Sequence, residues 1–316
     1  MKTIATLVLI NLFITFIILG SIEFGLRAFS NDINLQSTDK ELLKSGMYGE
    51  SFGLKPLSKG ESFGAVIQSD SFGFRKSSVP VKSDSNSILI IGDSVTMGVG
   101  VDSDSTFVGK MALLLENKDV GLLNFSLIGY NIYDYFNTIK YATENYNFKK
   151  CVIFYCLNDL TNDSKIIGAE SKTILSDVLK FLKSNSYLYM WAKSTFADRQ
   201  MAFYEFESDN YQVEKNITEF EVKLQEIKSL LSNKELQIVI LPYEYQLRME
   251  IPDLSIQDRI KSILQKNEIE FFDLFEQLKE SEIESEKLYL YADGLHFSNL
   301  GHRKIAKILS DENLLN

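Results

Sequence analysis

The chain has few of the side chains that most often carry catalysis or cross-linking. Its 316 residues include only two cysteines and two histidines. Cys151 and Cys156 lie on one short apolar run, where they cannot easily meet, so we predict two buried thiols rather than a disulfide. Because only two histidines occur, any imidazole base must be His296 or His302.

An excess of positive charge is also missing. Lys and Arg total 33 against 43 Asp and Glu, which gives a formal net charge of −10 and a pI near 4.9. Nucleic-acid binding normally requires clusters of Lys and Arg that neutralise phosphates. The composition therefore excludes nucleic acid as a partner. With 45% hydrophobic and 24% charged residues, the chain is expected to form one main globular domain with appendages.

A long uncharged run lies at the amino terminus. Residues 3–22 contain no charged side chain and are flanked by Lys2 and Glu23. A helix of that length spans about 30 Å, which matches the hydrocarbon core of a bilayer. A cleaved signal peptide is the alternative, but its apolar region is shorter, and Ile18-Leu19-Gly20 fits a small-x-small cleavage site poorly. We therefore predict an uncleaved transmembrane anchor over residues 1–23.

The orientation of this anchor follows from its flanks. Lys2 and the amino group precede the run, and Arg27 and Lys40 follow it, so the charge bias is nearly flat. Because almost nothing precedes the run, insertion with the amino terminus inside is the simpler choice. The remaining chain is then expected outside the cytoplasm. No cysteine lies near the end of the run, so bacterial lipoprotein processing is not predicted.

The stretch from Ile88 to Gly100 is the strongest signal in the rest of the chain. An apolar run of Ile and Leu stops at Gly92-Asp93-Ser94 and passes into a glycine-rich loop. An uninterrupted run of this kind is typical of a strand in a parallel sheet that is covered on both faces. Ligands bind at the carboxyl ends of such strands, so Ser94 is expected where a substrate can reach it.

Strand and helix patterns alternate from Ile88 to the end of the chain. Strands are expected at 88–91, 121–125, 151–155, 236–241 and 270–274, and helices at 106–117, 132–144, 214–231, 256–266 and 299–309. Repeated units of this kind specify a parallel sheet with helices on both faces. The predicted fold class is therefore α/β, a three-layer α/β/α sandwich with a five-stranded parallel sheet, formed by residues 87–316.

Two regions depart from this alternation. Residues 24–86 are rich in Ser, Gly, Asp and Lys, and contain three Phe-Gly pairs that we interpret as turns in an irregular extension of short strands. Residues 160–210 form a long insertion with several lysines and aromatic residues, including Trp191, the only tryptophan. This insertion is either a lid or substrate platform, or a pair of amphipathic helices that covers the core, and the sequence favours neither.

A histidine lies close to a carboxylate just before the last predicted helix. His296 follows Asp293 by three residues with Gly294 between them, so one tight turn can bring the carboxylate to a ring nitrogen. The other ring nitrogen is then free to take a proton from Ser94, as in a Ser-His-Asp triad. His302 lies about 240° further around a helix and is predicted to be structural. A metal site on Asp293 and the two histidines is therefore not expected.

Three donors for an oxyanion site follow the predicted strands. They are the backbone N–H of Ser94, the backbone of Gly129 and the side-chain amide of Asn158. Each has an ordinary explanation when taken singly, since Asn158-Asp159 is a turn signal and Gly129 suits the start of a helix. Their joint occurrence with Ser94 at one sheet edge favours a catalytic role.

Four blocks of the sequence occur in an order typical of a known superfamily: Gly92-Asp93-Ser94, Asn124 with Gly129, Asn158-Asp159, and Asp293-Gly294-Leu295-His296. Together they resemble the SGNH (GDSL-type) hydrolases over about residues 86–312. The resemblance implies a flavodoxin-like fold, with Ser94 as nucleophile, His296 as base and Asp293 as its orienter. It also implies Gly129 and Asn158 as oxyanion donors beside the Ser94 N–H. Residues 21–27 and 70–75 resemble membrane-anchored bacterial members of this superfamily.

Two positions depart from the superfamily pattern. Cys156 stands where the third block usually has glycine, and Val95 follows the serine where leucine is common. Neither change removes a catalytic atom, but Cys156 is expected to crowd the pocket floor. The chain has no Gly-x-Ser-x-Gly elbow, which argues against an α/β-hydrolase.

The sequence therefore predicts a membrane-anchored serine esterase that needs no metal or organic cofactor. Its expected substrates are carboxylic esters, such as O-acyl groups on envelope carbohydrate or lipid. An O-acyltransferase with the same triad is one alternative, and a non-catalytic envelope protein with a binding or assembly role is another. The presence of Ser94, Asn158, Asp293 and His296 counts against the second, because binding alone does not require all four.

Overall fold

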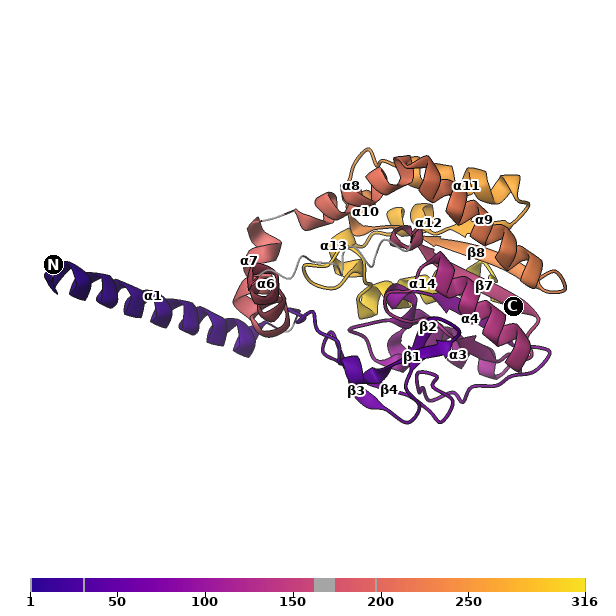
Figure 1. Ribbon diagram of the computed structural model, residues 1–316, viewed down its shortest axis with the longest axis horizontal. Helices are drawn as coiled ribbons and strands as arrows, with labels where there is room; N and C mark the ends of the chain where they lie inside the picture. Colours follow the sequence, from indigo (N-terminus) through magenta and orange to yellow (C-terminus); the bar gives the residue numbers. More distant parts are fainter. Residues whose placement is uncertain (1, 31, 162–173, 197, 316) are drawn as a thin grey trace.

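The computed structural model describes residues 2–30, 32–161, 174–196 and 198–315. Its centre is a five-stranded sheet in which all neighbouring strands are parallel (Figure 1). The strands are β5 (Ile88–Gly92), β6 (Leu122–Asn124), β7 (Lys150–Cys156), β8 (Glu235–Leu241) and β9 (Glu270–Asp273), in the spatial order β6-β5-β7-β8-β9. Numbered along the chain this order is 2-1-3-4-5, the flavodoxin-like order. The predicted fold class is confirmed.

Helices cover both faces of the sheet. The chain leaves β5 toward β6 on one side and returns to β7 on the other, so right-handed crossovers place the two connecting helices on opposite faces. The first, α3 (Phe107–Glu116), packs on α14 (Asn299–Asp311), and the second, α4 (Ile132–Asn145), packs on α9 (Glu214–Leu230). Helix α11 (Ser255–Lys266) connects β8 to β9.

Burial explains why the two central strands read as continuous apolar runs. Every residue of β5 and of β7 is buried, so neither strand has a solvent-facing side on which polar residues would alternate. Shorter helical elements complete this part of the chain: α2 (Ser94–Met97), α10 (Glu244–Arg248), α12 (Phe275–Lys279), α13 (Ser285–Leu288), and the 3-10 turns η2 (Ser103–Ser105) and η3 (Leu157–Asp159).

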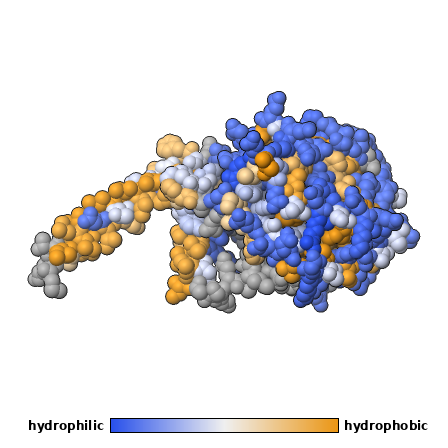
Figure 2. All heavy atoms as spheres, turned by 90° about the horizontal axis from the view of Figure 1, so that it is seen from above, coloured by the Kyte–Doolittle hydropathy of each residue, from blue (hydrophilic) through white to orange (hydrophobic). Residues whose placement is uncertain are grey.

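The amino-terminal helix α1 (Lys2–Phe29) projects away from the rest of the molecule (Figure 1). Within its segment Ile4–Phe29, an 18-residue window has a mean hydropathy of 2.4, and none of that window is buried in the protein. By length and composition it can cross a membrane, and its surface is almost uniformly hydrophobic (Figure 2). The helix extends past the predicted boundary at residue 23.

Two small antiparallel hairpins form the extension that follows α1. They pair β1 (Leu43–Tyr48) with β2 (Ser51–Leu54), and β3 (Lys59–Ser62) with β4 (Ala65–Gln68); a 3-10 turn, η1 (Lys40–Leu42), precedes them. Of the predicted turn pairs, Phe63-Gly64 and Phe72-Gly73 lie in turns, but Phe52-Gly53 lies inside β2. That part of the prediction is wrong because Gly53 serves packing: a Cβ there would meet the Met47 sulfur at 2.5 Å.

The described part of the insertion contains three helices, α6 (Ile174–Asn185), α7 (Tyr187–Phe196) and α8 (Arg199–Gln212). Residues 162–173 of the predicted insertion lie outside the described residues. Helix α8 packs on α9 and α10 and buries Tyr204 and Tyr211. Helix α7 instead contacts α1, so α6 and α7 lie between the amino-terminal helix and the sheet domain (Figure 1).

Candidate active site

The strand order brings three predicted site residues to one edge of the sheet. Because β5 lies between β6 and β7, the loops that follow these three strands are neighbours at their carboxyl ends. Ser94 follows β5, Gly129 lies in the loop after β6, and Asn158 lies in the turn after β7. The edge is also where the chain order of the strands reverses, which is the usual ligand position in open α/β sheets.

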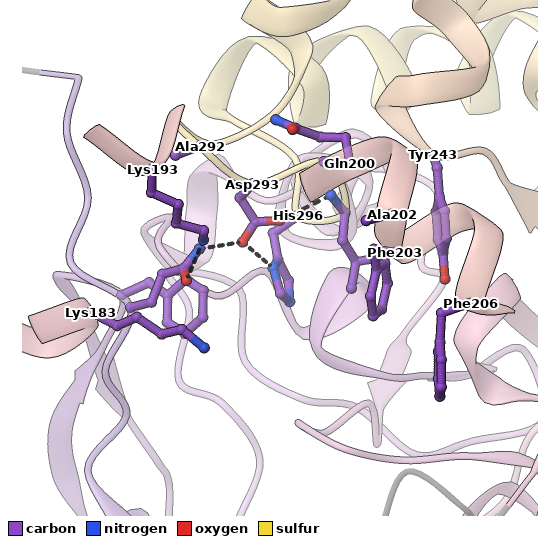
Figure 3. Close-up of a pocket in the computed structure, with 14 residues that line it drawn as sticks. Lys183, Lys193, Gln200, Ala202, Phe203, Phe206, Tyr243, Ala292, Asp293 and His296 are labelled. Carbon is purple, nitrogen blue, oxygen red and sulfur yellow. Dashed lines mark hydrogen bonds and ion pairs between the residues drawn. The ribbon is translucent and has the colours of Figure 1, made fainter. Parts of the chain in front are cut away.

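The structure brings Ser94, His296 and Asp293 together in one hydrogen-bonded line. Ser94 Oγ lies 2.8 Å from His296 Nε2, and His296 Nδ1 lies 2.8 Å from Asp293 Oδ2. When Nδ1 carries the proton and donates it to the carboxylate, Nε2 is left as the acceptor for the serine hydroxyl. Figure 3 shows the carboxylate and the imidazole facing each other.

A tight turn orients the Asp293 carboxylate, as its spacing from His296 predicts. Its other oxygen, Oδ1, accepts the backbone N–H groups of Leu295 at 2.9 Å and His296 at 3.1 Å. The carboxylate is therefore fixed by its own loop before it contacts the imidazole. Both carboxylate oxygens accept hydrogen bonds, so the carboxylate group has little freedom to rotate away from His296.

The charges of this pair shift both pKa values. Burial lowers the pKa of His296, but the charge of Asp293 and the hydrogen bond between them outweigh burial and bring it above its ordinary value. Burial raises the pKa of Asp293, but the charge of His296 and the hydrogen bonds to the carboxylate bring it down to about 2. Asp293 therefore stays ionised at any pH at which His296 acts as a base.

Asp93 links the serine to the predicted oxyanion side. Its Oδ1 accepts the N–H of Val95 at 2.9 Å, and its Oδ2 lies 3.3 Å from Ser94 Oγ and 3.4 Å from Asn158 Nδ2. The side chain is fully buried, and burial raises its pKa, although the charge of His296 and three hydrogen bonds oppose this shift. The sequence placed Asp93 in a motif but gave it no role. Only the folded structure shows that its Oδ2 contacts both Ser94 and Asn158.

The Asn158 amide is held at both ends. Its Nδ2 donates to Asp93 Oδ2, and its Oδ1 accepts from Tyr243 Oη at 3.4 Å. An amide nitrogen carries two hydrogens, so one remains for a ligand after the bond to Asp93. The contact with Tyr243 also fixes which way the amide points. Sequence reasoning found Asn158 but not Tyr243, which comes from the loop after β8.

Gly129 has the geometry that its glycine identity suggests. Its φ is +77°, in the left-handed region that side chains with a Cβ disfavour, and no heavy atom lies within 4 Å of the position a Cβ would take. Among the described residues, the N–H groups of Ser94 and Gly129 have no hydrogen-bond acceptor. Both donors are therefore available at the sheet edge.

His302 does not join this arrangement. It is fully buried in α14, where its Nδ1 accepts the N–H of Phe107 at 3.1 Å. Burial, together with the positive charges around it, lowers its pKa to about 3, so it is neutral. Within the described residues, no group of His, Cys, Asp and Glu side chains has a geometry that could hold a metal ion.

A pocket of about 640 Å³ opens beside the histidine (Figure 3). His296 and Asp293 contribute to its wall, together with side chains from the insertion and from the extension. Phe63, from the turn between β3 and β4, packs edge-on against the imidazole with ring centroids 5.2 Å apart. Cys156, predicted to crowd the pocket floor, is 1% exposed and does not line this pocket.

Gln36 is a further site residue that sequence reasoning missed. Its Nε2 donates to Asp293 Oδ2 at 3.3 Å, the same oxygen that accepts from His296, and its Oε1 accepts from Lys193 Nζ at 3.0 Å. The backbone of Gln36 also bonds to Lys183 and Ser184 of α6. A single glutamine thus connects the extension, the insertion and the Asp293 carboxylate. No local pattern marks it in the sequence.

Comparisons with known proteins find a likeness to several solved structures. No protein-family model and no curated protein matches the chain. Solved structures similar to it include a member of the lipolytic protein G-D-S-L family from Veillonella parvula, with a TM-score of 0.44 and 16% identity over 71% of this chain and 96% of that one. A family 3 carbohydrate esterase from Clostridium thermocellum has a TM-score of 0.44 and 13% identity over 73% and 98%. An acetylxylan esterase from Geobacillus stearothermophilus, solved as a catalytic mutant, has a TM-score of 0.44 and 14% identity over 73% and 96%.

Proposed function

We propose that this chain is a serine esterase that hydrolyses carboxylic esters through Ser94, His296 and Asp293. The observation that carries the proposal is the 2.8 Å contact between Ser94 Oγ and His296 Nε2, with Asp293 bonded to the other ring nitrogen. A hydroxyl bonded to an oriented imidazole is the arrangement that turns serine into a nucleophile.

The reaction follows from these contacts in two halves. Ser94 Oγ attacks the ester carbonyl while its proton moves to His296 Nε2, and the negative oxygen that forms is received by the Ser94 and Gly129 N–H groups and the Asn158 amide. The intermediate then expels the alcohol, which takes the proton from His296. Water attacks the acyl-serine with His296 again as base, and the acid leaves with Ser94 restored. Asp293 holds the imidazole and stabilises its charged form throughout.

The expected substrates are O-acyl groups on envelope carbohydrate or lipid, with α1 as an uncleaved anchor that holds the sheet domain outside the cytoplasm. Retention of α1 is supported by its last turns, which bond to the insertion: Glu23 accepts the backbone N–H groups of Tyr187 and Leu188. A segment removed after synthesis would not be expected to supply such contacts.

The test compares Ser94→Ala with Ser71→Ala, which removes an exposed hydroxyl in a turn of the extension. The Ser94→Ala protein should lose both ester hydrolysis and labelling by a fluorophosphonate, whereas Ser71→Ala should keep both. Full hydrolysis by Ser94→Ala would refute the proposal. On p-nitrophenyl esters of rising chain length, preference for short acyl groups would indicate deacetylation of carbohydrate, and preference for long ones a lipid.

A further inference from the structure

The pocket beside His296 has two chemically different sides (Figure 3). One side, here called the lysine side, carries Lys183 of α6 and Lys193 of α7. The other, the aromatic side, carries Phe203, Phe206 and Tyr243, and the rings of Phe203 and Tyr243 stack with centroids 5.6 Å apart. The imidazole and the carboxylate of the triad lie between the two sides.

The described residues of the pocket wall carry more positive than negative side chains. They include two ammonium groups, on Lys183 and Lys193, and one carboxylate, Asp293. That carboxylate is bonded to His296 and so belongs to the triad. A pocket with this balance attracts an anion, and the amide of Gln36 beside Lys193 adds a neutral hydrogen-bonding group.

The position of the pocket decides which half of an ester it receives. His296 lines it, whereas Ser94, Gly129 and Asn158 do not. In the proposed reaction His296 Nε2 gives its proton to the departing oxygen, so the alcohol part must lie on the histidine side. The acyl oxygen is received by the Gly129 N–H and the Asn158 amide, which do not line the pocket. The pocket therefore faces the alcohol part of the ester.

We propose that the alcohol part of the substrate carries an anionic group, a carboxylate or a phosphate, bound by Lys183 and Lys193. An apolar portion of the same alcohol lies against the aromatic side. This inference rests on the proposed esterase function and adds to it the charge of the substrate and the residues that recognise it.

The test uses acetate esters that differ only in the charge of the alcohol part. Full-length protein in a neutral detergent is assayed with 4-acetoxybenzoate, 4-acetoxyphenyl phosphate and the neutral methyl 4-acetoxybenzoate. The wild type should prefer an anionic ester, and Lys183→Gln should lower the ratio of anionic to neutral kcat/KM by ~10-fold, the scale of one charged hydrogen bond. Lys193→Gln should act in the same direction. Lys180→Gln, on the same helix but outside the pocket wall, should leave the ratio unchanged.

The two anionic esters distinguish the two kinds of anionic group. Preference for the phosphate ester would indicate a phosphorylated alcohol, and preference for the benzoate ester would indicate a carboxylated one. The inference is overturned if the wild type prefers the neutral ester, or if Lys183→Gln leaves the ratio unchanged while the neutral ester is still cleaved in a Ser94-dependent way. Failure of all the esters to react, with no fluorophosphonate labelling, would instead refute the esterase function.

A different observation concerns the outer face of α6. Four apolar side chains on this helix are largely exposed: Ile174 at 86%, Leu175 at 65%, Val178 at 46% and Phe181 at 65%. Ile174, Val178 and Phe181 follow helical spacing and so form one stripe. Lys183 lies on the opposite side of the helix and reaches the pocket. Helix α6 is therefore amphipathic, with its polar side toward the active site and its apolar side uncovered.

The amino-terminal helix is fastened at the end of α6. Arg27 donates to the carbonyl of Asn185, the last residue of α6, and its guanidinium lies 4.9 Å from the ring centroid of Tyr187. Glu23 accepts from the Ser186 hydroxyl at 3.0 Å and from the N–H of Leu188 at 2.8 Å. Glu23 and Arg27 are also the first charges after the apolar run of α1, where a spanning helix leaves the hydrocarbon.

The direction of α6 agrees with a place at the membrane surface. In Figure 1 α1 lies along the long axis of the view while α6 is seen nearly end-on, so α6 runs across the axis of α1. Figure 2 shows an orange column beside the base of α1, at the place that α6 takes in Figure 1. If α1 crosses a bilayer, α6 lies along its surface.

We infer that the apolar face of α6 lies in the membrane interface, so that lipid covers Ile174, Leu175, Val178 and Phe181. Amphipathic helices bind membranes in this way, with the apolar face in the headgroup region and the polar face outward. Continuity with α1 makes the bilayer, rather than a protein partner, the expected occupant.

Spin-label depth measurements test this placement. Both native cysteines are buried, so a nitroxide can be attached at Val178→Cys, with Lys180→Cys on the polar side as the matched control and Phe181→Cys as a second apolar site. Full-length protein is reconstituted in phosphatidylethanolamine–phosphatidylglycerol vesicles. The labels at 178 and 181 should be more accessible to oxygen than to an aqueous nickel complex, and the label at 180 the reverse. The inference is overturned if the label at 178 is as accessible to nickel as that at 180, or if spin–spin broadening at 178 reveals a second copy on this face.

Discussion

The loop before α14 and the helix α14 itself each hold one of the two histidines of the chain. The two environments shift the pKa of the imidazole in opposite directions. In the loop, a carboxylate raises the pKa of His296 against the effect of burial, and Ser94 Oγ contacts its free nitrogen. In the helix, burial beside positive charges lowers the pKa of His302 to about 3, and the ring accepts a backbone N–H.

The difference teaches that burial alone does not select a catalytic base. The His302 ring is fully buried and the His296 ring is 12% exposed. Of the two, within the described residues, only His296 has a carboxylate within hydrogen-bonding distance and lines the pocket of about 640 Å³. A neutral ring on the buried side of a helix contributes packing and one hydrogen bond. The same ring beside Asp293 can accept a proton and keep it long enough to pass it on.

The largest effect is expected when Asp293, the source of this difference, loses its charge. Asp293→Asn should lower kcat by ~10⁴-fold, because the imidazole loses both its orientation and the charge that stabilises its protonated form. In the wild type, kcat/KM should fall as the pH drops through the raised pKa of His296, since the protonated ring cannot accept a proton. Loss of the charge lowers that pKa, so the acid limb should move to lower pH in the variant. A pH profile of each protein checks this, and an unmoved limb would contradict it.

A smaller effect is expected on the oxyanion side of Ser94. Removal of the Asn158 amide in Asn158→Ala takes away one of three donors and should lower kcat by ~10²–10³-fold with little change in KM, because the lost bond forms mainly in the transition state. Steady-state kinetics on one short-chain ester measures both constants. If KM rises while kcat is kept, Asn158 binds substrate rather than the oxyanion.

The other histidine should affect folding and not catalysis. His302→Ala should leave kcat unchanged but lower the free energy of unfolding by ~1–3 kcal/mol, because the N–H of Phe107 loses its acceptor. The wild type should also lose stability as the pH falls below ~6.5 toward 3, since the unfolded chain binds a proton there that the folded one excludes. Urea unfolding at several pH values measures both effects. A lower kcat in a fully folded His302→Ala protein would contradict this and indicate that His302 takes part in catalysis.

The sheet and the contact between His296 and Asp293 were predictable because their signals are local. The fully buried strands β5 and β7 appear as apolar runs, and Asp293 and His296 are close enough in sequence for one turn to join them. The strand patterns also place Ser94, Gly129 and Asn158 at one sheet edge without knowledge of any side-chain contact.

Contacts between distant segments were not predictable. Gln36 reaches Asp293 across more than two hundred residues, and Tyr243 reaches Asn158 from another loop. Neither residue belongs to a pattern, because its position depends on how the extension and the insertion pack on the sheet domain. For the same reason the sequence could not decide whether the insertion covers the core or forms part of the site. In the structure α8 does both, since it packs on the core and lines the pocket with Phe203 and Phe206, while α6 and α7 reach the pocket and α1.

The bonds from Glu23 to the start of α7 have a practical consequence for preparing this protein. A shortened chain that begins after α1, the usual way to obtain a water-soluble form, would leave the Ser186 hydroxyl and the N–H groups of Tyr187 and Leu188 without their acceptor. The α6–α7 arm, and with it Lys183 and Lys193, would lose the attachment that sets its position. Assays on such a fragment would then report a wider pocket than the one the full-length protein presents.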